Sequence, residues 1–114
     1  MLRIALAFAL TLGAFGCKRS AAATSSEGAD LFANACARCH GADGSGGLPL
    51  FEGGPSPRDL RDPAFQRSHG DPQIRMTIVN GKGSGMPPFG ATFTDAQLDA
   101  LVAHVRALEA EKTK

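Results

Sequence analysis

A run of five residues, Cys36 to His40, constrains this chain of 114 residues more than any other feature. Two residues separate the thiols of Cys36 and Cys39, and His40 follows at once. Because positions three apart on a helical turn share a face, both sulfurs can bond the two vinyl groups of one porphyrin while His40 binds its iron. The run therefore predicts a covalently attached haem, with Cys36 and Cys39 as thioether links and His40 as an iron ligand.

Two other kinds of site also use a Cys-x-x-Cys pair. A zinc site needs four ligands, but the remaining cysteine is the distant Cys17, and His69 and His104 stand alone. A thiol redox motif follows a buried strand and opens a helix, whereas the residues before Cys36 have helical spacing. Zinc binding and thiol redox chemistry stay open as alternatives to haem attachment.

The beginning of the chain has the pattern of an export signal. Arg3 is followed by an uncharged stretch that is too short to span a bilayer comfortably. Residues 13–17, Gly-Ala-Phe-Gly-Cys, resemble a bacterial lipobox, so Cys17 is expected to carry a lipid and to anchor an exported, periplasm-facing protein to a membrane. Ordinary secretory cleavage after residues 21–23 is the alternative, and it would give a soluble periplasmic protein.

Composition divides the rest of the chain into a tether and one small domain. The residues after Cys17 are short, polar and rich in Ala and Ser, which favours a flexible tether. A domain of the remaining length buries a reduced share of its surface, so a bound porphyrin would complete its core. The predicted division is a signal peptide over 1–16, a lipid-anchored tether over 17–26, the folded domain over 27–110 and a C-terminal tail over 111–114.

The net charge of the chain does not point to a particular class of partner. The formal net charge is +1, which argues against nucleic acid or an acidic substrate as a partner, and a monomer is expected.

Helix start and stop signals predict an all-α domain. A helix is predicted to lead to Cys36, with Thr24 and Glu27 as its capping box. Further helical starts are predicted where a capping residue precedes a proline, at Ser56-Pro57, Asp62-Pro63 and Asp71-Pro72, the last of these helices ending at Asn80-Gly81. No alternating strand pattern of useful length interrupts these segments.

The closing helix has the clearest signals. Thr94 and Gln97 form a capping box, and Phe93 with Leu98 forms a hydrophobic staple. One apolar stripe follows, made of Leu98, Leu101, Val102, Val105 and Leu108. This helix therefore has one face to bury against the rest of the domain.

A second iron ligand is predicted in the Gly- and Pro-rich segment 81–90. The residue before a proline is pushed into an extended conformation, so Met86, followed by Pro87, is presented from a partly fixed loop. A thioether is a soft ligand that favours Fe(II). The rival ligands are Met76, inside a predicted helix, and the isolated His69 and His104.

Several motifs, in this order and spacing, make the domain similar to a class I cytochrome c: Gly28 with Phe32, Cys36 to Gly41, Ile78 to Gly81, Met86 to Phe89 and the closing amphipathic helix. The resemblance implies a small cytochrome c fold with three to five short helices around one covalent haem c. It also implies that His40 and Met86 bind the iron from opposite sides, and that Gly28 and Phe32 meet the last helix near His104.

Further residues receive roles from the same resemblance. The carbonyl of Pro49 is expected to accept the Nδ1 proton of His40. Arg58 and Arg75 are candidates to hold a haem propionate, as arginines do in some relatives, and Lys82 is a candidate to replace Met86 on the iron at high pH. For all three the alternative is a solvated charge.

The function that the resemblance implies is one-electron transfer between redox partner proteins, without catalysis of a reaction. One alternative is a haem-bearing electron-transfer subunit of a larger oxidase or dehydrogenase. Another is a peroxidase or gas sensor, which would need an open site at the iron. An exposed apolar surface around the haem edge would favour the subunit over the free carrier.

Overall fold

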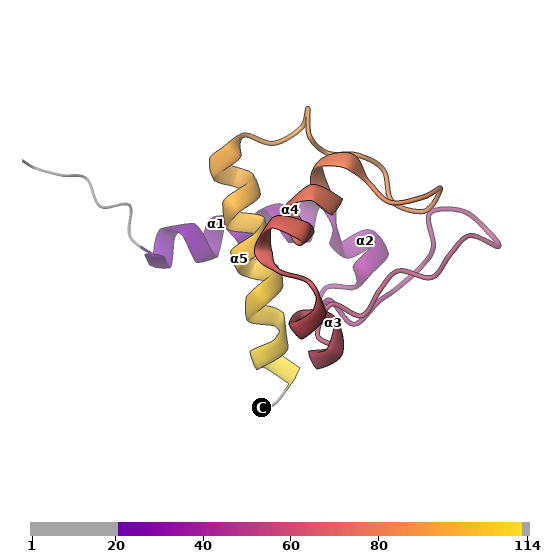
Figure 1. Ribbon diagram of the computed structural model, residues 1–114, viewed down its shortest axis with the longest axis horizontal. Helices are drawn as coiled ribbons and strands as arrows, with labels where there is room; N and C mark the ends of the chain where they lie inside the picture. The colour runs from indigo at the N-terminus through magenta and orange to yellow at the C-terminus, as the bar shows by residue number, and fades with distance from the viewer. Residues whose placement is uncertain (1–20, 113–114) are drawn as a thin grey trace, which may run out of the picture.

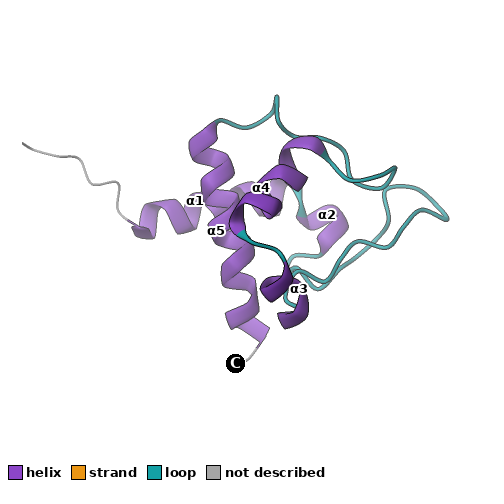
Figure 2. Cartoon of the chain, viewed as in Figure 1, coloured by secondary structure: helices purple, strands orange, loops and turns teal. Residues whose placement is uncertain are grey.

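The computed structural model of the protein describes residues 21–112, and these residues form an all-α domain (Figures 1 and 2). Its five helices are α1 (Ala21–Ala35), α2 (Ala37–His40), α3 (Pro63–Ser68), α4 (Asp71–Asn80) and α5 (Asp95–Lys112). The described part of the chain has no strand, and one isolated bridge joins Lys82 to Met86. The predicted fold class is therefore confirmed.

The first and last helices cross and form the centre of the domain (Figure 1). At the crossing the ring of Phe32 lies 4.9 Å from that of His104, measured between centroids. A Cβ atom added to Gly28 would overlap the backbone carbonyl of Ala100, so only a glycine lets the two helices approach this closely. The predicted meeting of Gly28 and Phe32 with the last helix near His104 is confirmed.

Helix α5 supplies most of the core, as its apolar stripe predicted. Its capping box is present: the backbone N–H of Gln97 donates to Thr94 Oγ1 at 3.2 Å, and the N–H of Thr94 donates to Gln97 Oε1 at 3.0 Å. The buried cluster joins this helix to α1, α4 and the loop before α3, and it consists of Phe32, Leu60, Ile74, Ile78, Leu98, Leu101, Val102, Val105 and Leu108; Phe65 of α3 packs against it and is partly buried.

The two short helices in front of α5 begin and end close to their predicted positions. Asp62 caps α3, because its Oδ1 accepts from the N–H of Ala64 at 3.0 Å. Helix α4 ends at Gly81, whose φ of 71° lies in the region that favours glycine. Its cap is Gly70 and not Asp71, so that start was predicted one residue late.

One predicted helix start is wrong, and of the one or two short helical turns predicted from Ser56 and Asp62, only the second is present. Helix α1 already includes Ala21, so Thr24 lies inside the helix and not at its start. Residues 55–59 are not helical, because the backbone around Arg58 and Leu60 bonds to other parts of the domain instead of to itself.

The first and last helices reach beyond the bounds of the predicted domain, 27 and 110, while the division itself stays a prediction. Helix α1 extends into the segment 17–26 assigned to a tether, and α5 continues to Lys112, into the predicted tail. The predicted signal peptide over 1–16 and the lipid at Cys17 lie outside the described residues. Within residues 21–112 no helix combines the length and the apolar character needed to cross a membrane.

Candidate functional site

A cavity of about 630 Å³ lies between the helices and the two long loops, which project to the same side of the molecule (Figure 1). Its walls are mainly apolar and include Phe32, Ile74, Ile78 and Leu101. Cys36, Cys39, His40 and Met86 all line this one cavity. The structure thus brings together the four residues that the sequence analysis selected, although Met86 is far from the others in the chain.

The Cys36 to His40 run lies where α1 passes into α2. The N–H of Cys36 donates to the carbonyl of Phe32 at 2.8 Å, so the run continues directly from α1. The carbonyl of Cys36 accepts from the N–H groups of Cys39 and His40, at 3.1 and 2.9 Å. This tight turn keeps both thiols and the imidazole at the wall of the cavity.

The ring of His40 is oriented by a backbone carbonyl. Its Nδ1 lies 3.1 Å from the carbonyl oxygen of Arg58, and because a carbonyl only accepts, Nδ1 carries the proton. The unprotonated Nε2 is then free to bind a metal ion. The sequence analysis assigned this acceptor to Pro49, and that assignment is wrong.

Met86 is presented from a loop that closes on itself. The N–H of Lys82 donates to the carbonyl of Met86 at 2.9 Å, and the N–H of Met86 donates to the carbonyl of Lys82 at 3.1 Å. After the two prolines, the N–H of Phe89 donates to the carbonyl of Ile78 at 2.9 Å. These bonds fix the loop to the end of α4 and hold the thioether at the cavity.

The rival ligands lie in different surroundings. The side chain of Met76 is 60% exposed and is not among the residues that line the cavity. His104 packs against Phe32 at the helix crossing. His69 does line the cavity, but its Nδ1 lies 2.9 Å from Ser68 Oγ.

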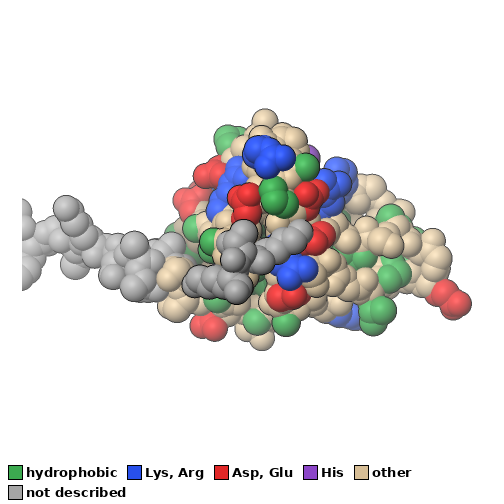
Figure 3. Space-filling view, turned by 90° about the horizontal axis from the view of Figure 1, so that it is seen from below, with side chains coloured by type: hydrophobic (Ala, Val, Ile, Leu, Met, Phe, Trp, Pro, Cys, Tyr) green, Lys and Arg blue, Asp and Glu red, His purple; other side chains and the backbone are tan. Residues whose placement is uncertain are grey.

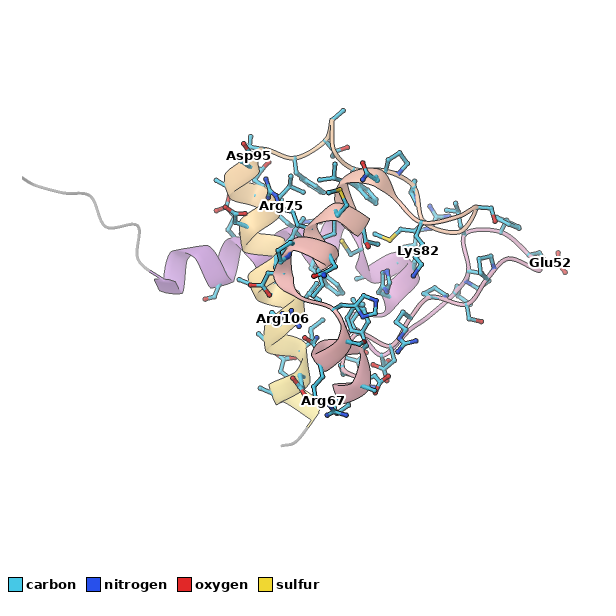
Figure 4. The ribbon with its side chains drawn as sticks, viewed as in Figure 1. Glu52, Arg67, Arg75, Lys82, Asp95 and Arg106 are labelled. Carbon is cyan, nitrogen blue, oxygen red and sulfur yellow. The ribbon has the colours of Figure 1, made fainter. Side chains whose placement is uncertain are left out.

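The two candidate arginines also differ. Arg58 lines the cavity, and its guanidinium lies 5.5 Å from the centre of the Phe65 ring and 3.1 Å from Asp62 Oδ2. Arg75 forms ion pairs with Asp95 and Asp99 of α5, at 2.6 and 2.9 Å (Figure 4). Of the two, Arg58 is therefore the one placed at the cavity.

The thiol of Cys36 has an unusual environment. Burial, and to a lesser extent the neighbouring Cys39, raises the pKa of the Cys36 thiol to about 11. Redox-active Cys-x-x-Cys motifs have a lowered thiol pKa, because the thiolate is the nucleophile. A protonated Cys36 therefore speaks against thiol redox chemistry. For zinc, no group of three or more His, Cys, Asp or Glu side chains within the described residues is placed to hold a metal ion.

Two residues that the sequence analysis did not select tie the surroundings of the site together. Gln66 is buried, and Arg106 donates to both its side-chain and its backbone oxygen at 2.8 Å. A polar residue in α3 and a charged residue in α5 gave no signal in the sequence, because isolated residues of these types usually lie in solvent.

The donor set fits a covalently held porphyrin. Two free thiols and one imidazole nitrogen lie at one part of an apolar cavity, and a thioether reaches the same cavity from a separate loop. Thioether attachment needs the first pair, and axial binding of iron needs the imidazole and the second sulfur.

Comparison with known proteins agrees with this fit. The sequence pattern of the family described as cytochrome c oxidase, cbb3-type, subunit III matches residues 23–105. The chain is also similar to the solved structure of the KustC0563 c-type cytochrome, with a TM-score of 0.63 and 34% identity, covering 72% of this chain and 96% of that one. Both findings support a small haem-binding domain.

Two curated relatives are longer proteins. The chain is 33% identical over 82 residues to the cbb3-type cytochrome c oxidase subunit FixP of Azorhizobium caulinodans, covering 72% of this chain and 26% of that protein. It is 32% identical over 87 residues to the subunit CcoP of Cereibacter sphaeroides, covering 76% of this chain and 28% of that protein. The chain thus spans about a quarter of the length of these relatives. It belongs to the cytochrome c family described as cytochrome c oxidase, cbb3-type, subunit III, and it binds one haem c covalently.

Proposed function

We propose that the chain is a monohaem electron-transfer protein that works as the haem-bearing subunit of a larger oxidase. The observation that carries the electron-transfer assignment is the convergence of Cys36, Cys39, His40 and Met86 on one apolar cavity. When bound, the haem supplies one-electron chemistry by cycling between Fe(III) and Fe(II). The protein holds and orients that group and makes or breaks no substrate bond.

Each of the four residues has one role in this proposal. Cys36 and Cys39 form the thioether links, and His40 binds the iron through Nε2, since its Nδ1 proton is held by the carbonyl of Arg58. Met86 would bind from its loop, and an iron held by both His40 and Met86 would be suited to electron transfer and not to binding a substrate. The guanidinium of Arg58 at the cavity wall is placed to pair with a propionate.

The assignment to an oxidase subunit is supported by the names of the relatives and by an exposed apolar loop. The loop that projects beside the cavity carries Leu48, Leu50 and Phe51, whose side chains are 76%, 43% and 48% exposed. Seen from below, the right-hand end of the molecule is mostly tan, with scattered green hydrophobic groups and a red acidic group at its tip (Figure 3), where Glu52 lies (Figure 4). Exposed apolar patches of this kind mark protein contact surfaces.

A diffusible carrier is the second candidate, and one observation favours it. The chain covers 96% of the KustC0563 c-type cytochrome but about a quarter of the oxidase subunits. A protein of this size can act alone if it meets its donor and acceptor in turn.

For the location of the protein, we propose export with a lipid anchor. Residues 1–16 would direct export, residues 17–26 would link the anchor to the domain, and the haem domain over 27–110 would face the periplasm. Lipidation of Cys17 would explain a third cysteine in an exported protein. Mass spectrometry of the mature N-terminus tests this proposal, and an unmodified peptide beginning at Thr24 would reject it.

The first test concerns the iron ligands. Optical spectra and a redox titration would be compared for the wild type and Met86→Ala, both made with the haem-attachment machinery, with Met76→Ala as the control. We expect the wild type to be low-spin with a far-red band from sulfur ligation, and Met86→Ala to lose this band and to fall in potential. Met76→Ala should change neither property.

Two results would contradict the assignment of Met86. If Met86→Ala kept both the band and the potential, another residue would hold the sixth position. A wild type that is already high-spin and binds small ligands would favour the peroxidase or sensor.

The second test separates the subunit from the carrier. The protein would be extracted from its native membranes in mild detergent, and the size of the haem-containing species measured. A subunit is expected to run with a complex much larger than 11.8 kDa, and Leu48→Ser with Phe51→Ser, which leaves the cavity lining intact, is expected to release it. Haem in a species of monomer size, unaffected by these substitutions, would identify the diffusible carrier.

A further inference from the structure

The carbonyl that holds the ring of His40 belongs to a segment without regular structure. Residues 55–59 form neither helix nor strand, so no ladder of backbone bonds fixes the position of the Arg58 carbonyl. The nearest buried anchor is Leu60, two residues further on. Its N–H donates to the carbonyl of Gly44 at 2.8 Å, and its own carbonyl accepts from Gln66 Nε2 at 2.7 Å. The N–H and the carbonyl of Leu60 thus both attach the segment to the rest of the domain.

Gln66 is a buried polar side chain, only 6% exposed, and its amide is fully used. Its Nε2 donates to the carbonyls of Leu60 and Val105, at 2.7 and 2.9 Å. Its Oε1 accepts from Arg106 Nη1 at 2.8 Å. A buried amide is costly unless it is bonded in this way, so Gln66 has one favourable orientation.

Arg106 fixes that orientation from α5. Besides Gln66 Oε1, its Nη1 reaches the backbone carbonyl of Gln66 at 2.8 Å, and its Nη2 donates to the carbonyl of His69 at 2.5 Å. Its Nε donates to Asp71 Oδ1 at 2.6 Å. The guanidinium of Arg106 donates to four oxygen acceptors, so it is held rigidly. Because a guanidinium can only donate, the side-chain amide of Gln66 must turn its oxygen toward Arg106.

Other contacts of the segment are weaker. The ion pair between Arg58 and Asp62 is 3.1 Å long, but both side chains are more than a third exposed. Arg61 pairs with Asp43, whose side chain is 59% exposed. Exposed pairs of this kind contribute little to stability. Arg61 also donates to Asp59 Oδ1 from its N–H and its Nε, at 2.9 and 3.3 Å, in a part-buried contact. The bonds of Gln66 are the side-chain bonds to this segment that are fully buried, and they act together with the Leu60 N–H bond to Gly44.

We propose that Arg106 and Gln66 are positioning residues for the iron ligand His40. In this proposal, which rests on the proposed function, they hold Leu60 and thereby keep the Arg58 carbonyl 3.1 Å from His40 Nδ1. A firm bond from Nδ1 makes the imidazole a more basic ligand, which favours Fe(III) and lowers the reduction potential. Loss of either residue loosens that bond and raises the potential.

The test compares two arginines, of which only Arg106 bonds to Gln66. Arg106 and Arg75 each join α4 to α5 through carboxylates, but Arg75 lies nearer the start of α5, beside Asp95 (Figure 4), and makes no bond to Gln66. The variants are Arg106→Met, Gln66→Met and the control Arg75→Met, each carrying haem. Two quantities are measured: the reduction potential, and the exchange rate of the His40 Nδ1 proton by NMR.

We expect Arg106→Met and Gln66→Met to raise the potential and to speed exchange of the His40 Nδ1 proton by about tenfold, the factor for loss of one typical hydrogen bond. Arg75→Met, whose carboxylate partners are exposed, should leave both quantities at their wild-type values. If Gln66→Met does not fold, Arg106→Met decides alone, because its side chain is only partly buried.

Two outcomes would overturn the proposal. One is an unchanged potential and exchange rate in Arg106→Met. The other is a shift in Arg75→Met equal to that in Arg106→Met, since the effect would then follow the loss of any arginine that joins α4 to α5 and not the loss of the bond to Gln66. Failure of the proposed function would be seen separately, as the absence of Met86 ligation in the wild-type spectrum. In that case the exchange rate of the His40 Nδ1 proton can still be measured and still tests the positioning role of Arg106 and Gln66.

Discussion

At the scale of single residues, Gly28 shows how one missing atom sets the distance between two helices. Its position on α1 faces the carbonyl of Ala100 on α5, and an added Cβ would also come within 3.1 Å of His104 Cβ. Backbone cannot move aside as a flexible side chain can. The crossing must therefore open if Gly28 gains a side chain.

We expect Gly28→Ala to destabilise the haem-bound protein by about 1–3 kcal/mol, the usual cost of overpacking. Denaturant unfolding followed by far-UV circular dichroism measures this. Ala33→Ser, on the exposed side of the same helix, is the control and should stay within about 0.5 kcal/mol of the wild type. Equal stability of Gly28→Ala and the wild type would mean that the crossing is looser than described.

His104, at the same crossing, links stability to pH. Burial lowers the pKa of His104 below its ordinary value of 6.5, and the charge of Glu111 opposes this effect. Because the unfolded chain then binds the proton more readily than the folded one, stability is complete above pH 6.5 and decreases as the pH falls below it.

We therefore expect the melting temperature of the wild type to fall more steeply than that of His104→Phe between pH 6.5 and pH 5. Phenylalanine keeps an aromatic ring against Phe32 and removes the titrating group. The quantity to measure is the difference in melting temperature between the two proteins, because the contributions of other titrating groups cancel in that difference. Parallel curves over this range would contradict the prediction.

The sequence is unequally informative about single residues. Cys36, Cys39 and His40 form a local motif, and Met86 is marked by the proline that follows, so all four could be selected from spacing. The acceptor for His40 is a backbone carbonyl, which every residue possesses. Nothing in the residue type distinguished Arg58 from Pro49, and only the path of the chain decides between them.

At the scale of secondary structure, α5 is the element that the sequence determines most completely. Its reciprocal cap and its apolar stripe are both local patterns, and all five stripe residues are buried. Helix starts that depend on distant partners were predicted less well. Ser56-Pro57 has a helical start signal, but the following backbone bonds to His40 and Gly44.

Removing the cap tests the contribution of this end of α5. Thr94→Ala should lower the free energy of unfolding by about 1 kcal/mol, because the N–H of Gln97 loses its acceptor. Thr92→Ala, an exposed threonine two residues earlier, is the matched control and should have little effect. Denaturant titration of both variants gives the comparison. A loss of equal size in both would assign the effect to the loop and not to the cap.

At the scale of the whole molecule, the cavity is large for so small a domain. It reaches the centre of the fold, since Phe32, Leu101 and Val105 belong both to the buried cluster and to the cavity wall. The core is therefore incomplete without the group that fills it. This organisation followed from the sequence only in outline, because the bonds of Gln66 and Arg106 join residues about 40 positions apart.

We expect the double variant Cys36→Ser, Cys39→Ser, which cannot attach haem, to lose cooperative unfolding. A domain of this size is marginally stable even with a complete core. A thermal scan of far-UV circular dichroism should show a weak, broad change where the wild type shows a sharp transition. A sharp transition with the helix content of the wild type would show that the polypeptide folds alone.

The placement of α1 also has a consequence for orientation. This helix begins at Ala21 on the side of the molecule opposite to the projecting loops, with the crossing of α1 and α5 between them (Figure 1). An attachment made through the residues before Ala21 would therefore lie on the side of the domain opposite to the projecting loops. The two projecting loops, which carry the cavity residues Leu50 and Met86, would then face away from the point of attachment.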